Sequence, residues 1–122
     1  MDAWIVEPNL VNRELIIRSL QSLGLEVLRF PDLAALVAAL SRGLVPRIVV
    51  LSFGAGGYEP AQVSVVRRTL AVPATRLVAV ISEPTLAHTS HLTDAGFDAV
   101  IIKPLSPRHL DQDLRTLLEA AS

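Results

Sequence analysis

Hydrophobic residues gather in five short runs along the chain. The runs lie at residues 3–6, 26–30, 47–51, 76–81 and 99–102. Four of them are nearly unbroken, which is typical of strands buried on both faces of a parallel sheet. The run at 26–30, Glu-Val-Leu-Arg-Phe, alternates more between apolar and polar residues, and this favours an edge strand.

Segments with helical spacing separate the runs. Apolar residues recur at i, i+3, i+4 and i+7 over residues 33–40, with Asp32 as the expected N-cap and Gly43 as the expected stop. Ser106 and Pro107 are typical of the N-cap and first turn of a last helix. The apolar positions of that helix are Leu110, Leu114, Leu117 and Leu118.

Three further helices are predicted, of which only the last has a weak pattern. One ends at Gly24, one follows Pro60, and one covers residues 84–96, which are rich in Thr, Ser and His and have few apolar anchors. The apolar positions are Val11, Leu15 and Leu23 in the first and Val63, Val66 and Leu70 in the second.

Strand and helix therefore alternate five times with short connections. Right-handed crossovers turn such a (βα)5 chain into an α/β fold, a doubly wound five-stranded parallel sheet with helices on both faces. We expect residues 1–122 to form a single domain. A functional site is expected outside the carboxyl ends of the strands.

The composition and charge of the chain limit the classes of partner that the sequence predicts. The chain is 51% hydrophobic with a formal net charge of −1 and no cysteine. Such a charge predicts no nucleic-acid or membrane partner, and the lack of cysteine excludes disulfides. No apolar run approaches the length of about 20 residues that a membrane span needs, and the N-terminus does not resemble a secretory signal. We therefore expect a cytoplasmic protein.

Three stretches carry a resemblance to a known family. WIVEPNLVNRELI at residues 4–16 places an acidic residue at a strand end before a helix start, and Gly57 lies in the loop after the third strand. AGFDAVIIKPLSP at residues 95–107 places Lys-Pro at the end of the fifth strand. With these features the chain resembles the receiver domain of bacterial response regulators over essentially its whole length.

The resemblance implies a specific chemistry, in which a histidine kinase transfers a phosphoryl group to an aspartate. It implies five positions: two acids after the first strand, the acceptor after the third, a Ser or Thr after the fourth and a lysine after the fifth. Carboxylates are needed because Mg²⁺ prefers oxygen ligands and neutralises the charge of the transferring group.

The first three positions depart from that pattern. The acid positions are occupied by Glu7, which is one methylene longer than Asp, and by Pro8, which offers no metal ligand. The acceptor position is Ser52, whose hydroxyl is a far weaker nucleophile than a carboxylate without a general base beside it.

The last two of the five positions keep part of the pattern that the resemblance implies. The fourth-strand position aligns with Ile81, and Ser82 beside it could substitute if the loop shifts by one residue. Lys103, the single lysine of the chain, occupies the fifth. Val100 stands where many receivers carry an aromatic residue.

These departures predict a pseudo-receiver, a receiver-like domain without phosphoryl chemistry. We expect no enzyme activity, no cofactor and no Mg²⁺ binding. A retained, partly buried lysine needs a counter-ion, so a structural ion pair between Glu7 and Lys103 is predicted. The alternative is an exposed lysine on a loop.

Function is then expected to depend on protein contacts. The face made by the fourth helix, fifth strand and fifth helix carries dimerisation and output contacts in the resembled family, so a histidine kinase, an output domain or a second copy of the chain are the predicted partners. The candidate residues on this face are His88, His91, Val100, Pro104 and Arg108. The two histidines at i, i+3 could also bind a metal, although no third ligand is evident.

Two alternatives remain open. One is a sensor for a nucleotide second messenger such as a cyclic dinucleotide, since guanidinium groups suit phosphates and stack on purines; a solvated helix face explains the same arginines. The candidate ligand residues are Tyr58, Arg67, Arg68 and Arg76. The other is an active receiver that uses Glu59 or Glu83 as a surrogate acceptor.

Overall fold

The five predicted strands form one parallel sheet. The computed structural model describes residues 2–53, 68, 75–82, 92–94 and 96–120. The strand order is β2-β1-β3-β4-β5, with every neighbouring pair parallel. The strands are β1 (Ala3–Val6), β2 (Val27–Arg29), β3 (Ile48–Ser52), β4 (Arg76–Ile81) and β5 (Ala99–Ile102).

The apolar runs locate the strands closely. β1, β4 and β5 coincide with their predicted runs, β3 is displaced by one residue, and β2 is shorter than its run. β2 lies at one edge of the sheet, as predicted. The prediction that 99–102 is buried on both faces is wrong, because β5 forms the other edge and only Ile101 in it is buried.

Three helices are described, and their starts follow local capping rules. Asn9 caps α1 (Leu10–Ser22), and Asp32 caps α2 (Leu33–Leu40) by accepting the Ala35 N–H at 2.8 Å. α5 (Pro107–Ala120) begins at Pro107, as predicted. The predicted helix after Pro60 lies almost wholly outside the described residues, and of residues 84–96 only 92–94 are described as helical.

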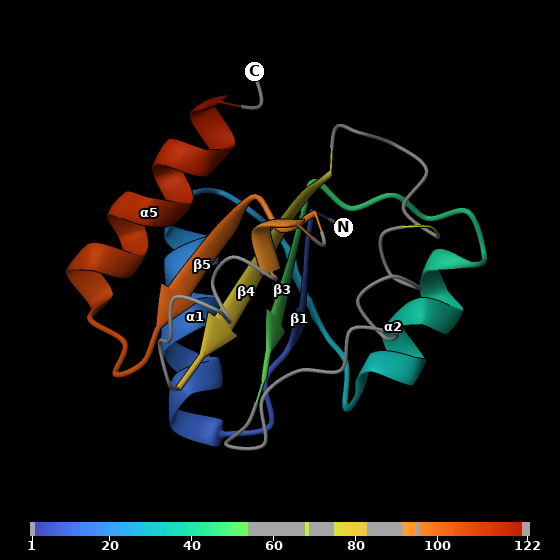
Figure 1. Cartoon of the computed structure of the whole chain (residues 1–122), viewed down its shortest axis with the longest axis horizontal. Helices are drawn as coiled ribbons and strands as arrows, with labels where there is room; N and C mark the ends of the chain where they lie inside the picture. Colours follow the sequence, from blue (N-terminus) through green and yellow to red (C-terminus); the bar gives the residue numbers. More distant parts are fainter. Residues whose placement is uncertain (1, 54–67, 69–74, 83–91, 95, 121–122) are drawn as a thin grey trace.

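The helices cover both faces of the sheet (Figure 1). α2 lies on one face, and α1 and α5 lie side by side on the other. The α2-side cluster consists of Trp4, Val6, Leu36, Ala39, Leu40, Val49, Leu51, Phe53, Leu77, Ala79, Ile81, Leu92 and Phe97. The α1/α5-side cluster consists of Ala3, Ile5, Ile16, Ile17, Leu20, Leu25, Ile48, Val50, Val78, Val80, Ile101, Leu110 and Leu114. None of the described helices is long and apolar enough to span a membrane.

The buried face of α1 differs in part from the predicted one. Leu15 and Leu23 pack against the α1/α5-side cluster, as predicted. Val11 is 68% exposed, whereas Ile16, Ile17 and Leu20 are buried against the sheet and α5. The first turn of α1 starts just beyond the carboxyl end of β1, so Val11 has no strand beneath it. Periodicity identifies a helix, but it does not identify the turn that extends past the sheet.

Candidate functional site

Three of the predicted site residues lie on one side of the carboxyl edge of the sheet. Successive side chains in a strand point to opposite faces. Ile5, Val50 and Ile101 all belong to the α1/α5-side cluster. Glu7, Ser52 and Lys103 each follow two positions later, so the alternation aims all three to that same side.

Glu7 and Lys103 form the predicted ion pair. Lys103 Nζ lies 3.3 Å from Glu7 Oε2, and the Glu7 side chain is completely inaccessible while that of Lys103 is 18% exposed. Among the described residues Oε2 accepts no hydrogen bond of good geometry, so its contact with Lys103 is an ion pair without an aligned N–H donor. The other carboxylate oxygen, Oε1, accepts the backbone N–H of Asn9 at 2.9 Å.

Ser52 stands beside this pair with an unused hydroxyl. Val6 pairs with Leu51 in the register of β1 and β3, which puts Glu7 and Ser52 at matching positions one residue further. The Ser52 Oγ is buried and makes no hydrogen bond in the part of the chain that the structure describes. No base therefore accepts its proton in this arrangement, and a nucleophilic role has no support from the geometry.

The remaining two positions offer no further chemistry. Pro8 is exposed and lacks any ligand atom. Ile81 is buried in the α2-side cluster, and Ser82 after it is exposed. Ser82 thus lies at the correct edge, but Ile81 keeps the last position of β4.

The five positions do not make a good Mg²⁺ site. Glu7 is the single carboxylate among them, and its oxygens face the Asn9 N–H and the Lys103 ammonium. Mg²⁺ requires near-octahedral oxygen ligands and usually takes one or two carboxylates with several waters. Among the described residues, no group of three or more His, Asp or Glu side chains is placed to hold a metal ion.

A groove runs between β5 and α5. Two adjoining cavities of about 260 and 410 Å³ share Val100, Ile101 and Asp113 in their walls. We call them together the β5–α5 groove. Ile102, which is 43% exposed, lines the first cavity together with His109.

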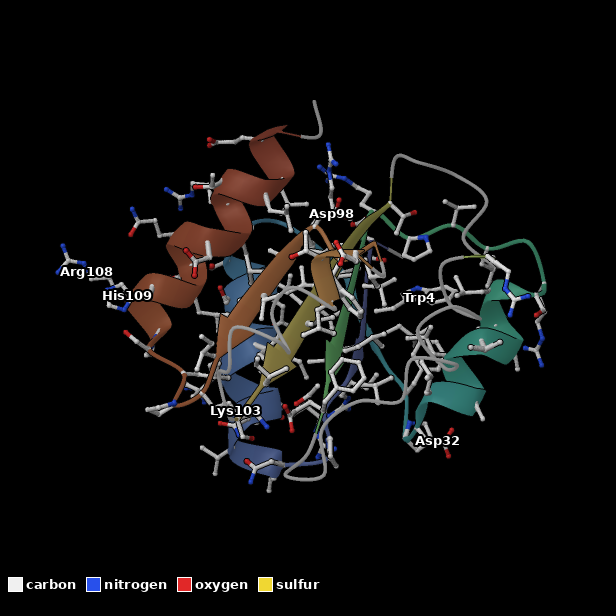
Figure 2. All side chains as sticks on the ribbon, in the orientation of Figure 1. Trp4, Asp32, Asp98, Lys103, Arg108 and His109 are labelled. Carbon is white, nitrogen blue, oxygen red and sulfur yellow. The ribbon has the colours of Figure 1, made fainter. Side chains whose placement is uncertain are left out.

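The predicted interaction residues lie partly on this groove. Val100 is half-buried in its wall, and Pro104, which follows a cis peptide bond, is exposed at its end. Figure 2 shows Arg108 and His109 projecting from the first turn of α5, and Lys103 at the carboxyl edge of the sheet. His88 and His91 lie outside the described residues.

Sequence reasoning named Val100 and Pro104 among the residues that line the groove and missed its polar α5 residues. His109 and Asp113 contribute to its α5 wall. They are four residues apart on the polar side of an amphipathic helix, and this spacing is the feature of the sequence that could have identified them.

Of the candidate nucleotide-binding residues, the structure describes Arg68 and Arg76. Arg76 Nη1 lies 3.8 Å from Asp98 Oδ1, and Asp98 also accepts the Leu77 N–H at 2.8 Å. Arg68 is exposed. The other residues of both alternatives, Tyr58, Arg67, Glu59 and Glu83, lie outside the described residues.

Comparison with solved structures places this geometry in a known fold. A CheY-like response regulator receiver domain protein from Methanospirillum hungatei superposes with a TM-score of 0.81 at 18% identity, covering 98% of this chain and 94% of its own. A response regulator from Thermotoga maritima gives 0.83 at 14% identity, with 98% of each chain covered. A protein described as pilus assembly-related, from Burkholderia pseudomallei, gives 0.78 at 19% identity, covering all 100% of this chain and 92% of its own.

Sequence comparison adds no closer relative. No family model matches the sequence, and no curated protein matches it either. The structural neighbours, all under 20% identical here, establish the architecture and not the chemistry. The chain has the flavodoxin-like fold of CheY-like response regulator receiver domains.

Proposed function

We propose that this chain is a pseudo-receiver, a phosphorylation-independent receiver-like signalling domain that acts through protein–protein contacts in two-component signal transduction. The observation that carries the proposal is the Glu7–Lys103 ion pair. The lysine that would pair with a phosphoryl group in the resembled family is already paired with a carboxylate of its own chain.

The acceptor position supports the same function. An acyl phosphate requires a carboxylate, and Ser52 supplies a buried hydroxyl with no base beside it among the described residues. With Pro8 replacing the second acid, a metal at this edge would be held by one engaged carboxylate. Phosphoryl transfer needs Mg²⁺ or an equivalent charge to stabilise its transition state, and the described residues of this edge offer neither an acceptor carboxylate at position 52 nor a second acid for the metal.

A domain of this kind works by binding, and the β5–α5 groove is the surface that we assign to it. The groove combines exposed aliphatic groups of β5 with polar groups of α5, as at a non-obligate interface. The partner is a histidine kinase, an output domain, or a second copy joined through the fourth helix, β5 and α5. The neighbour from Burkholderia pseudomallei is described as pilus assembly-related, and its description mentions no phosphorelay. This is compatible with a receiver fold that functions through protein–protein contacts.

An amide NMR titration with Mg²⁺ and beryllofluoride, a mimic of phosphoryl on aspartate, tests the proposal. We expect no saturable shifts at Glu7, Ser52 or Lys103, because the acceptor position holds a serine and the Glu7 carboxylate is engaged by Lys103 and the Asn9 N–H. The double variant Pro8→Asp, Ser52→Asp is the matched positive control, since it restores both missing acids.

Three outcomes separate the possibilities. Silence in the natural chain with a response in the double variant supports the pseudo-receiver. Saturable shifts at the three positions in the natural chain would overturn it, and shifts centred on Glu59 or Glu83 would instead identify a surrogate acceptor.

A further inference from the structure

A separate pocket of about 290 Å³ lies at the amino edge of the sheet, opposite the edge that carries Glu7 and Lys103. Leu25 and Arg47 in its wall come shortly before β2 and β3, and Leu23 is the C-cap of α1. The last turns of α5 reach this same end of the sheet, where the strands begin (Figure 1). We call it the amino-edge pocket. Its lining residues are Leu23, Leu25, Arg47, Arg115, Leu118 and Glu119.

The apolar part of the amino-edge pocket is continuous with the core. Leu25 is buried and belongs to the α1/α5-side cluster, and Leu23 and Leu118 pack against that cluster. The Leu23 and Leu25 N–H groups both donate to the Leu20 carbonyl, at 3.1 and 3.2 Å, which fixes this part of the wall at the end of α1. An alkyl group that lies against these leucines is removed from water, and this favours binding.

Two guanidinium groups from distant parts of the chain also line the pocket. The backbone of Arg47 is held on both sides, since its N–H donates to the Asp2 carbonyl at 2.8 Å and its carbonyl accepts the Arg76 N–H at 2.9 Å. The side chains of Arg47 and Arg115 are exposed. Neither guanidinium forms an ion pair or a hydrogen bond in the part of the chain that the structure describes.

Glu119 is the single carboxylate among the lining residues. It follows Arg115 by four positions, but the two side chains form no ion pair in the structure. The order of acid after base is the less favourable one for such a pair on a helix. Two guanidinium groups and one carboxylate give the lining a formal charge of +1. A monoanion neutralises this charge, whereas a dianion such as phosphate leaves negative charge in excess beside Glu119.

We infer that the amino-edge pocket is a binding site for a small aliphatic monocarboxylate. The carboxylate head lies with Arg47 and Arg115, because guanidinium groups match the geometry of carboxylate oxygens, and the alkyl chain lies against the three leucines. The volume is near the lower limit of about 300 Å³ for ligand pockets, which favours a short chain. The site goes beyond the proposed function, since none of its residues belongs to the carboxyl edge or lines the β5–α5 groove.

A methyl-resolved NMR titration with hexanoate tests the site. We expect saturable shifts of the methyl signals of Leu23, Leu25 and Leu118, and none at Leu36, which is buried on the other face of the sheet. From acetate to hexanoate, affinity should rise about fourfold for each methylene that enters the pocket. Hexylammonium, which has the same chain with the opposite charge, and inorganic phosphate should give no saturable shift at these leucines.

Charge variants identify the groups that hold the carboxylate. Arg47→Gln and Arg115→Gln should each weaken hexanoate binding about two- to fivefold, the range of an exposed ion pair. Glu119→Gln should strengthen it by a similar factor, because a repulsive charge is removed. The matched control is Arg108→Gln, which removes an exposed arginine from the first turn of the same helix and should leave the affinity unchanged. Far-UV circular dichroism verifies folding, and Glu119→Gln is decisive if the arginine variants do not fold.

Several results would overturn the carboxylate site. These are the lack of a saturable hexanoate shift, equal shifts with hexylammonium, or an effect of Arg108→Gln as large as that of Arg47→Gln. Phosphate binding as strong as hexanoate binding would identify a general anion site and would also overturn the inference. The beryllofluoride titration reports on the opposite edge of the sheet, so each of the two proposals can fail without the other.

Discussion

At the scale of single residues, the side chains at the carboxyl edge match one another in length and charge. Glu7 has one methylene more than an aspartate, which extends its reach toward Lys103 across the strand ends. Lysine suits this position because its ammonium is a compact point charge on a flexible stem, whereas the guanidinium of arginine is a larger planar fork with five donors. The chain places its single lysine at this position.

Substitution of Ser52 tests whether its hydroxyl contributes to the stability of the carboxyl edge. Its hydroxyl is buried without a hydrogen bond to any residue that the structure describes, and leaving such a group unsatisfied costs about 1–3 kcal/mol. We expect Ser52→Ala to be neutral or to raise the free energy of unfolding by up to about 1 kcal/mol, measured by urea denaturation.

Ser19→Ala is the matched control for that measurement. Ser19 is also buried, but its hydroxyl donates to Asp111, so its loss should lower the free energy of unfolding by about 1–2 kcal/mol. If Ser52→Ala is as destabilising as Ser19→Ala, the Ser52 hydroxyl has a partner, and the edge is not the inert site that we describe.

At the scale of elements, β5 and α5 present the surface that we assign to binding. Three of the five large hydrophobic residues that are exposed in the described part lie at the carboxyl edge: Leu10, Val11 and Ile102. The other two, Leu44 and Val45, lie in the loop between α2 and β3. Only Ile102 of these five lines the groove.

Self-association through this surface can be tested with one pair of variants. Ile102→Glu puts a charge into the groove, and Leu44→Glu puts the same charge at an equally exposed site elsewhere, with exposures of 43% and 47% in the natural chain. If the partner is a second copy, Ile102→Glu should weaken the dimer by about tenfold or more in sedimentation equilibrium, because burying an unpaired charge is costly. Leu44→Glu should leave the dimer intact.

The same experiment can exclude the homodimer. If the two variants weaken the dimer equally, the interface between the copies does not involve β5. A natural chain that is monomeric at every concentration tested would restrict the partners to other proteins, such as a kinase or an output domain.

At the scale of the whole molecule, one sheet separates two clusters of buried residues. The α2-side cluster contains Trp4, which packs against Phe30 with ring centroids 5.1 Å apart. The α1/α5-side cluster contains no tryptophan, since Trp4 is the single one in the chain. Because every central strand contributes alternate residues to both clusters, we expect the two to unfold together as one domain.

Leu36→Ala and Leu114→Ala test this cooperativity. Each removes a fully buried leucine from a different cluster and should cost about 2–5 kcal/mol in the free energy of unfolding. Both variants should shift the urea midpoint of Trp4 fluorescence and of far-UV circular dichroism equally. If Leu114→Ala leaves the Trp4 transition where it was, the clusters unfold separately and the single-domain prediction is wrong.

The amino-acid sequence by itself determined the elements, the fold class and the residues at the carboxyl edge. Apolar runs located β1, β4 and β5, and Asp32 marked the start of α2, because strand burial and helix capping depend on residues close in the sequence. It also predicted the Glu7–Lys103 pair, since the carboxyl ends of parallel strands meet at one edge.

Only the tertiary structure decided which of those residues are covered and which remain open. Val11 is exposed and β5 is half-buried because burial depends on the elements that pack above a residue, and local periodicity does not contain that information. The unpaired Ser52 hydroxyl and the β5–α5 groove likewise arise from distances between segments far apart in the chain. The contact between Glu7 and Lys103 could be inferred from the positions of two strand ends. The shape of a cavity, in contrast, depends on all the elements that line it.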